Sequence, residues 1–116
     1  MAVVSSHTLN GSDGTHAGGI AVSLRDLITG EILFDTAMDD GGRLVQDIAE
    51  NRINPAAKYE LVFATGAYWQ AQNLPRPGVQ IMAEVVVRFS MADITARYHI
   101  PVILSPNSYS IWWSGE

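Results

Sequence analysis

Residues 19–30 read GIAVSLRDLITG, and this stretch decides the class of fold. Ile20, Val22 and Leu24 fall on one face of an extended chain, and polar residues alternate with them on the other face. A period of two is typical of a β-strand with one face in the core, and the Thr-Gly pair that ends the stretch is typical of a turn. The sequence therefore predicts a strand over residues 19–27.

The same alternation recurs along the chain, interrupted about every ten residues by Gly, Asn, Asp or Pro, which is typical of a sandwich or barrel. The other expected strands cover residues 2–9, 31–36, 43–48, 58–65, 82–90, 96–104 and 108–113. The good helix formers at 66–73 precede a Pro-rich segment, so we expect one short helix there. These elements predict an all-β protein, a two-sheet, eight-stranded sandwich with one short helix, formed as a single domain over residues 1–116.

The composition indicates a folded chain and excludes several kinds of chemistry. Of the 116 residues, 47% are hydrophobic and only 16% are charged, which favours a packed core and some apolar surface covered by partner subunits. Cysteine is absent, so disulfides, thiolate catalysis and cysteine-bound metals are excluded. The sequence contains no His-x-His or His-Glu-x-x-His pattern, no Gly-x-Ser-x-Gly elbow and no phosphate loop. We expect no bound metal.

The charge pattern and the hydropathy argue against two kinds of binding partner, nucleic acids and membranes. The net charge is −5 and the seven Lys and Arg residues are scattered, so we expect no binding to nucleic acid. No apolar run approaches the ~20 residues of a membrane span, and the first residues do not form a secretory signal. A cytoplasmic protein without a membrane partner is expected.

Two histidines are candidates for a polar functional site. Alternation places His99 on the face of its strand opposite to Tyr98 and Ile100, whereas the face of His7 is less clearly assigned. Taken alone, each imidazole is typical of a surface or half-buried histidine, but residues from opposite ends of the chain can meet in the fold. His16 lies in a Gly-rich loop and is expected to be solvated.

Two further features are unusual for strands. Pro101 lies inside an expected strand, and because it cannot donate a ladder hydrogen bond, it should mark an edge, a strand start or a bulge. Trp112 and Trp113 are adjacent on the expected last strand, so they cannot both face one core. At least one indole should lie on the outer surface, in a contact with another subunit or with a ligand.

Four segments carry a more specific pattern: SHTL at 6–9, DGGR at 40–43, YELVF at 59–63 and YHIPVILSP at 98–106. In this order, over essentially the whole chain, they resemble the 5-hydroxyisourate hydrolases, also called transthyretin-related proteins. The Tyr-His-x-Pro-x-x-x-Ser-Pro pattern of the last segment is the most specific part of the resemblance.

The resemblance implies a transthyretin-like (prealbumin-like) sandwich that assembles into a homotetramer, with pockets at the interface between dimers. It also implies the hydrolysis of a small-molecule substrate, 5-hydroxyisourate, to 2-oxo-4-hydroxy-4-carboxy-5-ureidoimidazoline in urate degradation, without a cofactor. The catalytic residues that it implies are His7, Arg43 and His99, a set that the hormone carrier transthyretin lacks. Water activation and proton transfer are expected of the two histidines, and Arg43 is expected to hold substrate oxygens by directional hydrogen bonds.

The C-terminus departs from the family. Its enzymes usually end in Tyr-Arg-Gly-Ser, whereas this chain has Trp112-Trp113-Ser114-Gly115 at the matching positions. If Trp112, Trp113 and Ser114 bind the substrate, the site has lost a phenol and a fixed positive charge. Two alternatives therefore stay open: the same site acting on a different cyclic substrate, and a non-catalytic carrier of a small aromatic molecule.

Overall fold

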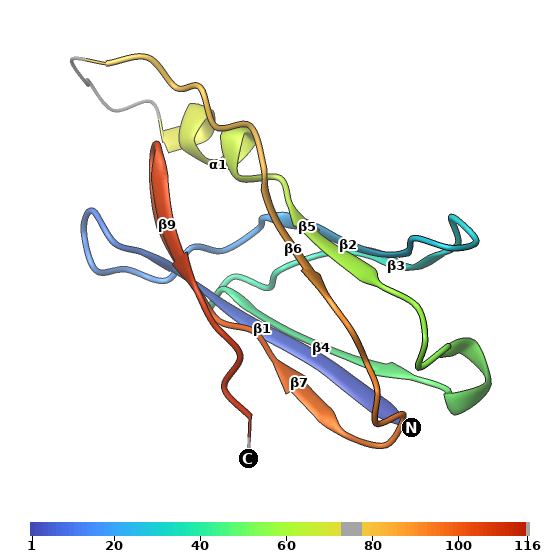
Figure 1. The fold of residues 1–116 in the computed structure, drawn as a ribbon. Coiled ribbons are helices and arrows are strands. Elements are labelled where there is room, and N and C mark those ends of the chain that lie inside the picture. The colour runs from blue at the N-terminus through green and yellow to red at the C-terminus, as the bar shows by residue number, and fades with distance from the viewer. Residues whose placement is uncertain (73–77, 116) are drawn as a thin grey trace.

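The computed structural model describes residues 1–72 and 78–115, which form two sheets packed face to face (Figure 1). The strands are β1 (Ala2–Asn10), β2 (Ala21–Asp26), β3 (Ile32–Ala37), β4 (Arg43–Ile48), β5 (Tyr59–Phe63), β6 (Val85–Phe89), β7 (Arg97–His99), β8 (Val102–Ser105) and β9 (Ser108–Ile111). The five-stranded sheet has the order β4-β1-β8-β9, with β7 also paired to β1, and the four-stranded sheet has the order β3-β2-β5-β6. The predicted all-β two-sheet sandwich is confirmed.

The expected number of strands was wrong, because the strand expected over 96–104 is divided in two. Both parts, β7 and β8, run parallel to β1, and Pro101 lies between them. Proline has no N–H to give to the ladder, so the pairing stops there and resumes at Val102. Pro101 was predicted to mark an edge, a strand start or a bulge, and it lies directly before the start of β8. The described residues form nine strands instead of eight.

The helix lies where the sequence placed it, within one residue. Helix α1 spans Thr65–Gln72, and the last residue of the expected range, 73, lies outside the described residues. A 3-10 helix, η1 (Glu50–Arg52), was not predicted, because three residues are too few to show a helical period. Neither helix in the described part of the chain has the length and apolar character needed to cross a membrane.

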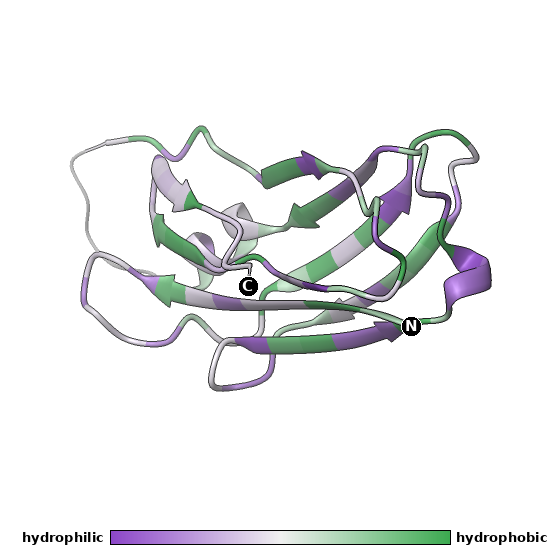
Figure 2. Ribbon diagram, turned by 60° about the horizontal axis from the view of Figure 1, so that its bottom comes forward, coloured by the Kyte–Doolittle hydropathy of each residue, from purple (hydrophilic) through white to green (hydrophobic). Residues whose placement is uncertain are grey.

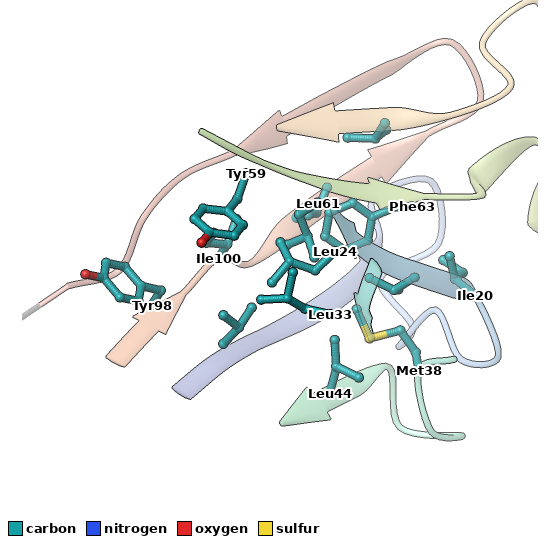
Figure 3. Packing of buried hydrophobic residues seen from close by; sticks show 14 of the residues in the cluster. Ile20, Leu24, Leu33, Met38, Leu44, Tyr59, Leu61, Phe63, Tyr98 and Ile100 are labelled. Carbon is teal, nitrogen blue, oxygen red and sulfur yellow. The ribbon is translucent and has the colours of Figure 1, made fainter. Parts of the chain in front are cut away.

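The core lies between the sheets and is built by the alternating residues. Bands of apolar and polar residues alternate along the strands in Figure 2. On β5 the inward residues Tyr59, Leu61 and Phe63 have no exposed surface, and Leu24 of β2 lies beside them in Figure 3. Burial of one such apolar side chain contributes about 1.5–3 kcal/mol, so the register of these strands is strongly determined.

Strand β1 also has two distinct faces, although its sequence does not show them clearly. Val4, Ser6 and Thr8 are almost completely buried on the core side. The Ser6 hydroxyl donates a hydrogen bond to the Ile100 carbonyl oxygen at 2.6 Å, and that of Thr8 donates to the Ala17 carbonyl oxygen at 2.6 Å. These bonds satisfy two buried polar groups. The alternate residues of β1, His7 among them, therefore face outward from the sandwich.

Candidate active site

The register of β1 and β4 brings His7 and Arg43 together. The two strands are antiparallel, and His7 is the direct partner of Arg43, so both side chains lie on the outer face of the five-stranded sheet. Arg43 is exposed, and its guanidinium has no ion-pair or hydrogen-bond partner within residues 1–72 and 78–115. Its donors are therefore available to a ligand that lies against this face.

The turn before β4 fixes the position of Arg43. The Asp39 carboxylate accepts hydrogen bonds from the backbone N–H groups of Gly41 and Arg43, each at 2.9 Å. Gly42 adopts a φ of +72°, and its carbonyl oxygen accepts a hydrogen bond from the Thr8 N–H at 2.8 Å. A Cβ atom at Gly42 would lie 2.5 Å from the Thr8 carbonyl oxygen, so only glycine fits this turn beside β1.

His99 reaches the same face from β7. In the parallel pairing of β1 and β7 it is the partner of Ser5, whose hydroxyl is hydrogen-bonded to His99 Nδ1 at 2.8 Å. Tyr98 and Ile100 on either side are buried in the core and His99 is only partly buried, which confirms its predicted orientation. Within the described residues no hydrogen bond engages His99 Nε2, so this nitrogen is free to bind a ligand or water.

Ser5 was missed by the sequence analysis, although a signal for it was present. It lies two residues before His7 and so shares its face of β1.

His16 is exposed, as expected, but it contacts His7. His7 Nε2 and His16 Nδ1 are 2.9 Å apart, and the ring centroids are 4.9 Å apart with the planes inclined by 24°. The Asn, Gly and Asp residues of the loop at 10–14 reverse the chain, so that His16 pairs with Leu9 in an isolated bridge. This turn signal could have placed His16 beside β1.

The surroundings of His7 lower its pKa below the ordinary value of a histidine. Partial burial of the ring contributes most, followed by the positive charges of Arg43 and His16, while His99 has a smaller effect in the same direction. A hydrogen bond with the Gly41 backbone acts in the opposite direction. The imidazole is consequently neutral, and able to accept a proton, over a wider pH range than a free histidine.

The C-terminal tail runs beside β7 (Figure 1). The N–H of Ser114 donates to the His99 carbonyl oxygen at 2.8 Å, and that of Trp112 donates to the Pro101 carbonyl oxygen at 3.4 Å. Both indoles are exposed, by 45% for Trp112 and 61% for Trp113, and the Trp113 ring lies 6.2 Å from that of Tyr98.

The two tryptophans line a separate, largely apolar cavity of about 770 Å³ together with Phe89 and Tyr98. The lining does not include His7, Arg43 or His99. The tail therefore meets the polar cluster through the backbone of Ser114, and its indoles lie at a different pocket.

The chemistry of the cluster is that of proton transfer and hydrogen bonding. It combines imidazoles, which can accept a proton, with one guanidinium and one hydroxyl, which can donate hydrogen bonds to a developing oxyanion. Across the two described ranges, no three His, Asp or Glu side chains are grouped to hold a metal ion.

The sheet orders and the helix after β5 define a transthyretin-type sandwich. The structure of 5-hydroxyisourate hydrolase from Klebsiella pneumoniae matches it with a TM-score of 0.80 and 26% identity, covering 99% of this chain and 100% of that one. Transthyretin from Sparus aurata, at 24% identity, shares the fold with a TM-score of 0.79 over 97% of both chains.

Sequence relatives identify the family. The 5-hydroxyisourate hydrolase of Ralstonia nicotianae is 30% identical over 114 residues, which is 97% of each chain. That of Pseudomonas aeruginosa is 30% identical over 115 residues, covering 97% of this chain and 90% of the relative. The pattern of the HIUase/Transthyretin family matches residues 4–113. The chain belongs to this family, and the resemblance found in the sequence is confirmed.

The close approach of Gly42 to β1 predicts a stability difference between two glycine substitutions. Gly30 also has a positive φ, of +78°, but nothing lies within 4 Å of its added Cβ, so Gly30→Ala should cost only the left-handed strain of about 1–2 kcal/mol. Gly42→Ala should lower the free energy of unfolding by more, since its methyl group also meets the Thr8 carbonyl oxygen. Urea unfolding of both variants measures the difference, and equal losses would contradict the packing described here.

The lowered pKa of His7 predicts how stability depends on pH. Well above the unfolded-state pKa the ring is neutral in both states, and as the pH falls through that value only the unfolded chain takes up the proton readily. Wild type should therefore lose more stability than His7→Gln between about pH 8 and pH 5. Unfolding free energies at both pH values test this. Identical losses in the two proteins would show that the His7 pKa is not lowered by folding.

Proposed function

We propose that this protein hydrolyses 5-hydroxyisourate to 2-oxo-4-hydroxy-4-carboxy-5-ureidoimidazoline, a step of urate degradation, without a metal or an organic cofactor. The observation that carries the proposal is the in-register pairing of His7 with Arg43, beside the Ser5–His99 pair on the same sheet face. Relatives at 30% identity that carry the name 5-hydroxyisourate hydrolase support the choice of substrate.

The proposed reaction opens a cyclic amide by attack of water on a ring carbonyl. A base removes a proton from water as the C–O bond forms, donors stabilise the oxyanion, and the ring nitrogen takes up a proton as the C–N bond breaks. The open Nε2 of His99 suits it for water activation, because Ser5 holds the other ring nitrogen. Arg43 donates hydrogen bonds to substrate oxygens, and His7, neutral beside it, shares in the proton transfer.

The assay of this proposal follows the ultraviolet absorbance of freshly generated 5-hydroxyisourate. The protein should accelerate its decay above the spontaneous rate, and His99→Ala should reduce kcat by about 10²–10⁴-fold, the usual contribution of a general acid or base. Ile28→Ala, which changes an exposed side chain between β2 and β3, serves as the control and should leave kcat unchanged. An unaccelerated decay with wild type would refute the activity, and full turnover by His99→Ala would remove His99 from the mechanism.

The C-terminal residues 112–115 favour a second candidate function, in which the same polar cluster acts on a different cyclic substrate. Trp112 and Trp113 replace a phenol and a guanidinium of the usual family tail, and indoles suit a larger or less polar ring. Within one chain the indoles line a pocket separate from the polar cluster. We therefore propose that Trp112, Trp113 and Ser114 set substrate preference through the backbone contact of Ser114 with His99, which fixes the tail beside the cluster. Ratios of kcat/KM for 5-hydroxyisourate and for other cyclic amides, in wild type and in Trp113→Arg, distinguish the two candidates.

We also propose that the enzyme is a cytoplasmic homotetramer in which a second copy covers the site. The polar cluster lies on an open sheet face, and Val45 of β4 and Ile103 of β8 are exposed there by 63% and 39%. Covering this face would bury these apolar side chains and shield the site from bulk solvent, while the water molecule that attacks the substrate is retained. Size-exclusion chromatography with light scattering should give four times the mass of one chain, and a monomer at micromolar concentration would contradict this assembly.

A further inference from the structure

The pair formed by His7 and His16 is the strongest feature that the proposed mechanism leaves unused. The loop that carries His16 is held tightly against β1. Asn10 N–H donates to the Thr15 carbonyl oxygen at 2.8 Å, and Ala17 N–H donates to the Thr8 carbonyl oxygen at 2.9 Å. These two bonds flank His16 in sequence, so its backbone has little freedom to carry the ring away from His7.

The contact between the rings restricts their protonation. A hydrogen bond between His7 Nε2 and His16 Nδ1 needs a hydrogen on one nitrogen and a lone pair on the other. If both rings were cationic, both nitrogens would carry hydrogens, the bond would be lost, and two positive charges would face each other. One added proton can be accommodated by the pair, but a second is strongly disfavoured.

The other groups around His7 reinforce this restriction. The titratable or charged groups that act on it are Arg43 from β4, His99 from β7 and His16 from the loop, and each disfavours a cationic His7. Asp13, in the same loop as His16, has its carboxylate bound to the hydroxyl and N–H of Thr15. In the described part of the chain, no carboxylate forms an ion pair with either ring.

We propose that His16 is a positioning residue for His7: its ring holds the His7 imidazole through an N–H···N bond, and the two rings together hold only one added proton. The inference rests on the proposed function, because its consequence is that His7 is held in position and begins the reaction in the neutral form that can accept a proton. His16 acts through His7, and its side chain is exposed.

A histidine NMR titration tests the pair without any assay of activity. In ¹⁵N-histidine-labelled wild type, the resonances of His7 should titrate in two coupled steps, because its ring shares a hydrogen bond with a second imidazole. In His16→Asn, whose amide can still donate to His7 but cannot become charged, His7 should follow a single-site curve. Ser12→Ala changes an exposed side chain of the same loop and should keep the coupled curve. A single-site His7 curve in wild type that is unchanged in His16→Asn would overturn the inference.

The value of kcat and its dependence on pH test whether the His7–His16 pair contributes to the hydrolysis. His16→Ala removes both the hydrogen bond and the charge, so its kcat should fall by about tenfold to 10²-fold, as expected for a displaced catalytic group. Without the His16 charge, which lowers the pKa of His7, the acidic limb of the His16→Ala profile should also move to higher pH. His16→Asn should restore most of the kcat at about pH 8, because its amide can still donate a hydrogen bond to His7.

The outcomes separate this inference from the proposed function. If wild type does not hydrolyse 5-hydroxyisourate, the proposed function fails, and the NMR titration still decides whether the rings form a coupled pair. If wild type is active and the coupling is present, an unchanged kcat and an unchanged acidic limb in His16→Ala would refute the positioning role.

Discussion

The alternation along β1 is the constraint on which the rest of the structure depends. This strand lies inside the five-stranded sheet and pairs with β4, β7 and β8. Val4 and Thr8 are fully buried in the core, and a slip by one residue would expose them and bury His7 in their place. The hydrophobic core therefore determines that Ser5 and His7 face outward, and the same register selects their neighbours on β7 and β4.

Arg43, the partner of His7, and His99, the partner of Ser5, each lie next to a point where regular strand pairing stops. Arg43 follows a tight turn that only glycine fits at position 42, and His99 ends the short strand that stops before Pro101. The register of the parallel pairing with β1 is the same on both sides of Pro101, and the Ile100 N–H still bonds to the Ser5 carbonyl oxygen at 2.8 Å. The site thus depends on local backbone chemistry as much as on its polar side chains.

The sequence predicted the sandwich and the orientation of His99, because strong apolar neighbours marked the inner face of each of those strands. It did not predict the face of His7, since the hydroxyls of Ser5 and Ser6 conceal which positions are buried. Ser6 is 2% exposed because its hydroxyl bonds to a backbone carbonyl oxygen across the sheet, which no local pattern reveals. The Asn, Gly and Asp residues at 10–14 indicate a chain reversal before His16, but the contact of His16 with His7 also depends on the pairing of Leu9 with His16, which no local pattern reveals.

The charge distribution explains why basic groups can gather on one face of an acidic protein. The net charge is −5, yet within the described residues the three ion pairs lie away from His7, Arg43 and His99. Burial of the ring is the largest cause of the lowered pKa of His7, and the Arg43 guanidinium and the neighbouring imidazoles act in the same direction. A carboxylate partner would have the opposite effect and would also occupy the donors of Arg43. The missing ion pair at Arg43 thus keeps its donors available for a substrate oxygen and keeps His7 in the form that accepts a proton.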